Sequence, residues 1–273
     1  MSIESTVAIN PAHQPFEVAF FTRKVWLTYA IVTLNVLIFI IQVKFSASPA
    51  QAIRNGSDFQ TLLNFGAKTN FWIINQGQWF RLLTPIFLHI GLTHLAINCY
   101  SIWQIGPIVE RLYGPSRFAA LYLLTGIGGS IGSLIGVYFG KVDVVSAGAS
   151  GAIFGLLGVC LVTSYRYRAE MPAQFRRALG PGLMPVIALN LLFGFINNAT
   201  AMFGDKTPLT SHFIGNSAHI GGLITGAIVA LFIPYTLLNQ NINSRTEKIM
   251  LWACILLTGF CFARAYWMRP FRF

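Results

Sequence analysis

A single serine stands at the centre of a stretch of small residues, Gly148-Ala149-Ser150-Gly151, which a long apolar run follows. No charged residue occurs between Asp143 and Arg166, a length sufficient for a helix that crosses a bilayer. Ser150 is therefore expected near the start of a membrane helix. Its hydroxyl has two interpretations. It could bond to a carbonyl of its own helix, as is common in membranes, or act as a nucleophile, which requires a base supplied by another helix.

Three polar residues in other apolar segments could complete such a site, and these are His219, His94 and Asn98. A histidine inside a membrane helix is energetically costly and is a functional candidate for that reason. Taken alone, each of these residues could equally be an interhelical hydrogen-bonding group. The topology described below places all of them, with Ser150, near the outer ends of their helices. This shared depth favours a common site.

The composition is that of an all-α polytopic membrane protein. Mean hydropathy is +0.61, hydrophobic residues make up 55% and charged residues only 10%, against about a quarter in a soluble domain. The net charge of +11 is explained by basic loops that set orientation, and no nucleic-acid motif is present, so nucleic acid is not an expected partner. The four cysteines show no CxxC spacing and are interpreted as packing residues, and neither a metal nor a cofactor is expected.

The apolar runs predict six membrane helices and a seventh at the C-terminus, interrupted by Arg264. Residues 1–24 are an expected cytoplasmic tail, loose up to residue 22, residues 25–236 the six-helix core, and residues 237–273 a linker with the seventh helix. The polar loop 44–80 must fold on something and carries aromatic residues suited to the bilayer interface. The expected helices are residues 25–43, 85–109, 118–140, a helix beginning near Ser150, 183–199, 216–235 and 249–267.

Lys and Arg counts predict the orientation. The N-terminal flank and the loops after the second, fourth and sixth helices are the basic ones, which places all of them on one side if the N-terminus is cytoplasmic. The helices that carry Ser150, His219 and His94 then enter from the outer face. One feature contradicts the rule, because a spanning seventh helix puts Arg269 and Arg272 outside.

Small residues repeat at helical spacing next to both reactive candidates. Gly151, Gly155 and Gly158 share one face of the fourth helix, and Ala218, Gly222 and Gly226 share one face of the sixth. Such faces let two helix backbones approach closely, which is helix packing in its own right. The same approach would bring the Ser150 hydroxyl within hydrogen-bond reach of His219.

The set of motifs resembles that of the rhomboid intramembrane serine proteases, over about residues 25–236. Gly148-Ala149-Ser150-Gly151 resembles the family's GxSG, and Ala218-His219 with the glycines after it resembles the sixth-helix motif. Two departures occur. Phe154 stands where a number of members have tyrosine, and Phe80 separates Trp79 from Arg81 in the tryptophan-arginine element. The remaining matches are His94 with Asn98, and Gly106, Glu110 and Gly114 as the GxxxExxxG element.

This resemblance implies a rhomboid-like bundle and an intramembrane serine endopeptidase that cleaves transmembrane helices near the outer face. Ser150 would be the nucleophile and His219 the base of a two-residue dyad, and His94, Asn98 and the Ser150 amide would form the oxyanion hole. It also implies single-pass or multi-pass membrane substrates, a multi-pass location in the bilayer of a bacterial-type cell membrane, and a movable cap over residues 203–216. The helix-packing residues near the site would be Gly148, Gly151, Gly155, Gly222 and Gly226.

Two other functions remain open on the sequence. A catalytically silent rhomboid-like scaffold would lack the serine or the histidine, and this chain has both. A small-solute transporter would favour broken helices and polar residues that reach the midplane, whereas here the polar residues cluster near the outer face.

Overall fold

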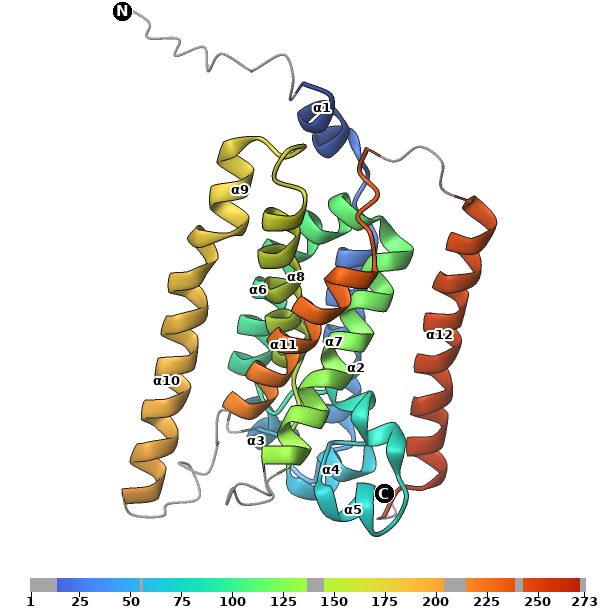
Figure 1. The fold of residues 1–273 in the computed structure, drawn as a ribbon. Coiled ribbons are helices and arrows are strands. Elements are labelled where there is room, and N and C mark those ends of the chain that lie inside the picture. The colour runs from blue at the N-terminus through green and yellow to red at the C-terminus, as the bar shows by residue number, and fades with distance from the viewer. Residues whose placement is uncertain (1–13, 55, 137–144, 204–214, 239–242, 271–273) are drawn as a thin grey trace, which may run out of the picture.

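The computed structural model describes residues 14–54, 56–136, 145–203, 215–238 and 243–270. These residues form helices and connecting turns, apart from one isolated bridge between Lys68 and Ser146 (Figure 1). The predicted all-α architecture with a seventh long helix is confirmed. The long helices are α2 (Leu27–Lys44), α6 (Leu92–Tyr113), α7 (Pro115–Gly136), α8 (Ser150–Arg166), α10 (Met184–Phe203), α11 (Asn216–Phe232) and α12 (Ser244–Trp267).

Length and hydropathy identify the chain as an integral, multi-pass membrane protein. Within the described residues, four stretches are long and apolar enough to cross a bilayer, namely Phe16–Lys44, Pro115–Gly136, Ala173–Ile196 and Ser244–Trp267. Helices α8 and α11 are apolar but shorter. They pack with α7 in the centre of the bundle, whereas α10 and α12 flank it on opposite sides (Figure 1).

The segment between α2 and α6, residues 45–91, is here called the α2–α6 connection. It packs over one end of the bundle. It contains α3 (Pro49–Arg54), α4 (Phe59–Asn64), α5 (Asn70–Ile74), η2 (Trp79–Leu82) and η3 (Thr84–Phe87). We call this the connection end. Hydrogen bonds from Asn70 to Leu134 O and from Gln78 to Met268 O bring the last turn of α7 and the end of α12 to it.

A buried arginine holds the α2–α6 connection together. Arg81 is fully buried, its Nε donates to Gln78 Oε1 at 2.6 Å, and its Nη1 donates to the carbonyls of Leu63 and Ala67, both at 2.8 Å. Burial lowers the pKa of Arg81 to about 10, so the side chain is still charged at neutral pH. One charged fork thus ties the end of α4 and the turn after it to η2.

Two sequence expectations about helix limits are wrong. The second long helix was expected from Pro85, but Thr84–Phe87 forms the separate 3-10 turn η3 and α6 begins only at Leu92. The tail was expected to be loose up to residue 22, but Gln14–Thr22 forms α1. Its Phe16 and Phe20, one turn apart, pack on Phe175 of α9 (Ala173–Leu179) with ring centroids 5.3 and 4.9 Å away. This aromatic contact is tertiary, and local sequence gives no sign of it.

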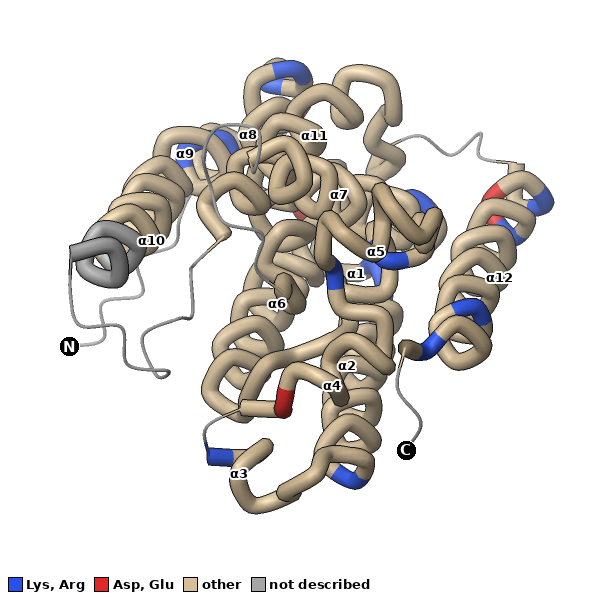
Figure 2. The backbone as a smooth tube through the Cα atoms, turned by 90° about the horizontal axis from the view of Figure 1, so that it is seen from below, with Lys and Arg blue, Asp and Glu red and all other residues tan. Residues whose placement is uncertain are grey.

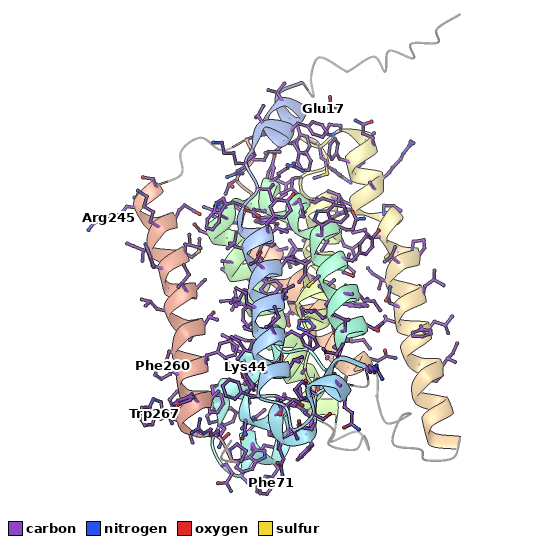
Figure 3. All side chains as sticks on the ribbon, turned by 180° about the vertical axis from the view of Figure 1, so that it is seen from behind. Glu17, Lys44, Phe71, Arg245, Phe260 and Trp267 are labelled. Carbon is purple, nitrogen blue, oxygen red and sulfur yellow. The ribbon has the colours of Figure 1, made fainter. Side chains whose placement is uncertain are left out.

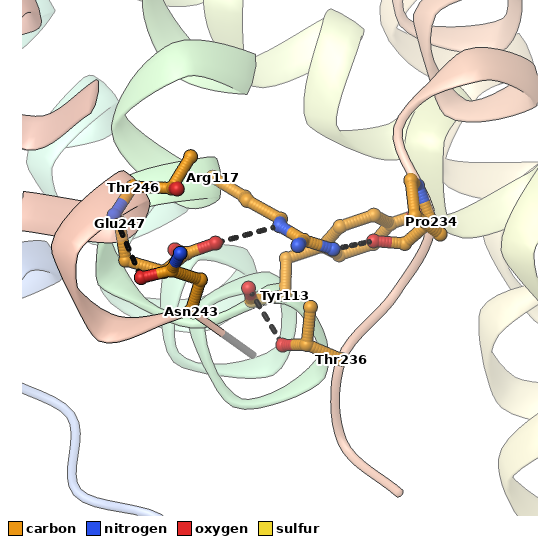
Figure 4. Close-up of polar contacts among 7 residues, drawn as sticks. All are labelled: Tyr113, Arg117, Pro234, Thr236, Asn243, Thr246 and Glu247. Atoms are coloured by element: carbon orange, nitrogen blue, oxygen red, sulfur yellow. Dashed lines mark hydrogen bonds and ion pairs between the residues drawn. The ribbon is translucent and has the colours of Figure 1, made fainter. Parts of the chain in front are cut away.

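At the opposite end of the bundle, the polar contacts in Figure 4 join α7, α12 and the chain after α11. Arg117, near the start of α7, pairs with Glu247 of α12 at 3.0 Å and donates to Pro234 O at 2.7 Å. Thr236 donates to Tyr113 O at 2.8 Å. These bonds connect the chain after α11 to the α6–α7 turn and hold the first turn of α12.

Glu110 fastens α6 to the start of α2. Its carboxylate accepts from the backbone N–H groups of Trp26, Leu27 and Thr28 at 2.8–3.0 Å and from Thr28 Oγ1 at 2.7 Å. No side-chain cap from the chain before α2 satisfies these donors. Gly106, one turn earlier, permits the close approach, because an added Cβ would lie 2.6 Å from Thr28 Cγ2. A carboxylate at a helix N-terminus is stabilising, and here the buried carboxylate of Glu110 accepts four hydrogen bonds from the start of α2.

We expect Glu110→Gln to lower the free energy of unfolding by about 2–3 kcal/mol, because an amide keeps one acceptor oxygen and turns an NH2 group toward buried N–H donors. Glu247→Gln is the control, since its partly exposed pair with Arg117 contributes about 1 kcal/mol or less. Thermal unfolding in detergent measures both. Equal losses for the two variants would contradict the capping role of Glu110.

Candidate functional site

The first turns of α8 and α11 carry the reactive candidates. Helix α8 begins at Ser150, and α11 begins at Asn216, so that His219 lies in its first turn. Because Ser150 opens α8, the residue four before it, Ser146, lies outside the helix. Ser150 makes no side-chain hydrogen bond to a described carbonyl, unlike Ser164 of the same helix, which donates to Leu161 O at 2.8 Å. Its half-buried hydroxyl is thus available for other chemistry.

Backbone contact between α8 and α11 sets the separation of these two turns. A Cβ added to Gly222 would lie 2.0 Å from the carbonyl oxygen of Gly151, and one added to Gly226 would lie 1.9 Å from that of Gly155. Backbone oxygens cannot move aside as a flexible side chain can. The helices can therefore adopt this spacing only with glycine at 222 and 226.

An aromatic stack orients the imidazole of His219. The ring lies parallel to that of Phe154, with centroids 4.2 Å apart and an interplanar angle of 3°. Phe154 is one turn after Ser150 on α8, so the stack holds His219, which is 7% exposed, beside the start of that helix. Phenylalanine thus stacks without offering a hydrogen bond. No direct bond joins the described Ser150 and His219 side chains, and catalytic bonds are often longer before substrate binds.

A second glycine lets His94 approach the same point. Gly148 has φ +135°, a conformation that L side chains rarely adopt, and an added Cβ would lie 2.6 Å from His94 Cε1. Asn98, one turn further along α6, is buried and donates one amide hydrogen to His94 O at 2.8 Å. Its NH2 group carries a second hydrogen for another acceptor.

All four residues line one cavity of about 1030 Å³ at the connection end of the bundle. Its wall is completed by Val186, Asn190 and Phe193 from α10. This volume is at the upper limit for small-molecule sites, roughly 300–1,000 Å³, so a peptide segment would fit. Hydroxyl, imidazole and amide groups converge there without a carboxylate. Among the described residues, no cluster of His, Cys, Asp or Glu could hold a metal ion.

The structure adds residues that the sequence analysis overlooked. His89 is fully buried with its ring centroid 5.5 Å from that of His94, and its position just ahead of His94 in the chain was a signal that could have been noticed. Lys68 exchanges both backbone hydrogen bonds with Ser146 at 2.9 Å and so fastens the chain that leads into α8. Nothing local pairs these two distant segments. The expected cap lies almost entirely within residues 204–214, outside the described part of the chain.

We expect Gly222→Ala to reduce any activity of this cavity about a hundredfold, because one methyl group forces two backbones apart by an ångström or more. The free energy of unfolding should fall by about 1–3 kcal/mol. Gly259→Ala on α12 is the matched control, since its added Cβ meets nothing within 4 Å. Activity is compared at equal amounts of folded protein. Equal activity of the two variants would show that the site does not depend on this glycine contact.

Comparison with known proteins identifies the family of this chain. Residues 76–236 match the Rhomboid domain family. The chain is similar to the rhomboid protease GluP of Bacillus subtilis, with 42% identity over 76% of this chain and 35% of GluP. It is similar to the putative rhomboid protease YdcA of Bacillus subtilis, with 34% identity over 68% of this chain and 86% of YdcA. It is also similar to the rhomboid protease AarA of Providencia stuartii, with 28% identity over 91% of this chain and 86% of AarA. The match thus spans about a third of GluP but most of YdcA and AarA.

Proposed function

Because this chain belongs to the rhomboid family, we propose that it is an intramembrane serine endopeptidase with Ser150 as nucleophile and His219 as base. The observation that carries the proposal is the meeting of the two first turns at one cavity, with the His219 ring stacked one turn from Ser150. The relatives named above are rhomboid proteases, which supports the protease class.

In this mechanism, Ser150 Oγ attacks the scissile carbonyl while a ring nitrogen of His219 takes the hydroxyl proton. The tetrahedral intermediate collapses when the C–N bond breaks, and His219 returns the proton to the leaving amine. Water then attacks the acyl-serine ester by the same route, which releases the carboxylic acid and restores Ser150. The start of α11 places the positive end of its dipole at His219, which favours the neutral imidazole that a base requires.

The oxyanion would be held by N–H donors at the rim of the cavity. The Ser150 amide opens α8, where intrahelical acceptors are missing, and the His94 ring and the second hydrogen of Asn98 face the same cavity. Donors of this kind stabilise charge that appears only in the transition state.

We expect Asn98→Ala to be milder than loss of Ser150. One oxyanion donor is worth about 3 kcal/mol, or roughly a hundredfold or more in rate, and the other two donors would compensate in part. The kcat for a cleaved membrane reporter measures this, with thermal unfolding as the control for lost packing. An Asn98→Ala variant that is folded yet as inactive as Ser150→Ala would assign Asn98 a larger role.

The substrate is proposed to be a transmembrane helix cut near the outer face, in a bacterial-type membrane with the N-terminus cytoplasmic. Basic residues flank α1 and α9, at the end of the bundle opposite the α2–α6 connection, which favours that end as the cytoplasmic one. Figure 2 marks Lys and Arg in blue, among them those on α9 and α12. The cavity lies at the other end and would draw water from outside. A substrate helix must unwind locally to expose a carbonyl, so small or helix-breaking residues near the cut would favour cleavage.

Labelling by a fluorophosphonate probe, with mass spectrometry of the modified peptide, tests the nucleophile directly. The expected result is a single adduct on Ser150, together with cleavage of a reporter transmembrane helix in proteoliposomes. A folded protein that neither labels nor cleaves would instead be the silent scaffold. Labelling at another serine would end the assignment of Ser150.

A further inference from the structure

Apart from Asp58, whose carboxylate accepts hydrogen bonds from Ser46, Ala47 and Thr61, the charged side chains described at the connection end of the bundle are basic. No Asp or Glu occurs between Asp58 and Glu110, and none follows Glu247. Arg264 lies in the last turn of α12 and Arg269 just after it, and the bond from Gln78 to Met268 O places this turn against the α2–α6 connection. Basic residues at this end run against the distribution expected if it is the outer one. They therefore call for an explanation other than orientation.

Arg264 lies in an environment that suits a side chain that binds an anion. Its side chain is exposed, and its Nη2 donates to Met268 Sδ at 2.9 Å, a weak acceptor. No carboxylate among the described residues pairs with it. A guanidinium in this position offers a planar fork of donors, which fits two oxygens of a phosphate.

A groove beside Arg264 has room for an apolar chain. It encloses about 410 Å³ between α12, η2 and α7, and apart from Arg264 and Gly77 its lining is formed by hydrophobic side chains. Helix α12 buries only Cys261 and Ala265, both at this end, so the groove lies where the helix joins the bundle. The groove residues are Gly77, Trp79, Phe80, Leu82, Leu83, Ile127, Leu257, Phe260, Cys261 and Arg264.

Aromatic side chains place the groove at the level of lipid headgroups. Trp79 and Trp267 are 62% and 80% exposed, and Phe71 of the α2–α6 connection is also exposed. Figure 3 shows Phe71 and Trp267 at the connection end with Phe260 between them and the middle of α12, while Arg245 marks the other end. Exposed tryptophans are typical of the bilayer interface, so a phosphate on Arg264 would lie at its natural depth.

We propose that this groove binds one anionic phospholipid, with an acyl chain between α12 and η2 and the phosphate on Arg264. The charge of the site selects the headgroup. Arg269, whose guanidinium stacks on Tyr266 at 4.5 Å, adds a second positive charge. None of the residues that line the groove is acidic, so the groove itself offers no carboxylate to a choline or ethanolamine group. The lipid would fill the space between α12 and the bundle, where α12 otherwise buries only Cys261 and Ala265.

Native mass spectrometry of the full chain in detergent, titrated with phosphatidylglycerol or phosphatidylcholine, tests the headgroup contact. The wild type should retain one phosphatidylglycerol, and Arg264→Gln should weaken its retention about tenfold, because it loses a charge-assisted bond. Lys248→Gln, at the opposite end of α12, is the control and should retain it unchanged. Equal retention of the two lipids by the wild type, or equal loss in both variants, would overturn the proposal.

A matched pair of neighbouring leucines tests the groove itself. Leu257 lines it, whereas Leu256 is 68% exposed and is not part of the lining. Leu257→Trp should fill the groove and displace phosphatidylglycerol with Arg264 still present, and Leu256→Trp should leave binding intact. Leu256 and Leu257 are 68% and 46% exposed, so the fold should tolerate both changes. Retention that is the same in both tryptophan variants would show that no chain occupies the groove.

Discussion

Ser150→Ala should abolish cleavage of a transmembrane reporter and leave the fold intact. The hydroxyl lies at the first position of α8, where it makes no bond to a described carbonyl, so its removal leaves no buried partner unsatisfied. The expected loss is that of a whole nucleophile. In serine proteases only a residual acceleration over water, roughly 10³–10⁴-fold, survives such a change.

Ser164→Ala is the control for this experiment, because Ser164 is in the same helix and bonds back to Leu161 O. It represents the alternative role first considered for Ser150, a hydroxyl that serves only its own helix. Cleavage is measured with purified protein in proteoliposomes, and folding is followed by thermal unfolding. Full activity of the purified Ser150→Ala variant would end the nucleophile assignment.

His219→Ala should cause a loss of the same size and should also remove probe labelling at Ser150. Without a base, the hydroxyl keeps its proton and is a weak nucleophile toward both the peptide and the fluorophosphonate. The change opens a gap over the face of Phe154, where the ring had stacked at 4.2 Å, so a moderate loss of stability is expected as well. Labelling therefore has to be compared between equal amounts of folded protein.

The double variant separates a dyad from two independent effects. If Ser150 and His219 act as one unit, Ser150→Ala with His219→Ala should be no slower than either single variant. Phe154→Leu tests the stack, since it keeps an apolar contact but not a flat face, and activity should fall while Ser150 is still labelled slowly. Labelling that persists undiminished in His219→Ala would mean that another group activates the serine.

Much of the fold could be predicted from local properties of the chain. An uncharged apolar run long enough to cross a bilayer must satisfy its backbone within itself, and it is helical for that reason. This sufficed for α2, α7, α8, α11 and α12, whose predicted and observed limits differ by a few residues. The identity of Ser150 and His219 as candidates also came from sequence, because polar groups in such runs are rare and costly.

The tertiary structure alone decided how these helices meet. The small faces of α8 and α11 were visible in the sequence, but their register, Gly222 on Gly151 and Gly226 on Gly155, depends on which surfaces pack. The stack of His219 on Phe154 follows from that register. Spacing along one helix contains no information about its offset against another, because that offset is set by backbone contacts between residues far apart in the chain.

The irregular segments were the least predictable part. Arg81 was matched to the tryptophan-arginine element, but the sequence did not predict that it is buried and donates to the carbonyls of Leu63 and Ala67. Likewise, the tail that was expected to be loose contains α1. Both depend on partners elsewhere in the chain. Hydropathy describes how each segment meets lipid or water, whereas the placement of a short polar segment follows from the hydrogen bonds it can make to the rest of the protein.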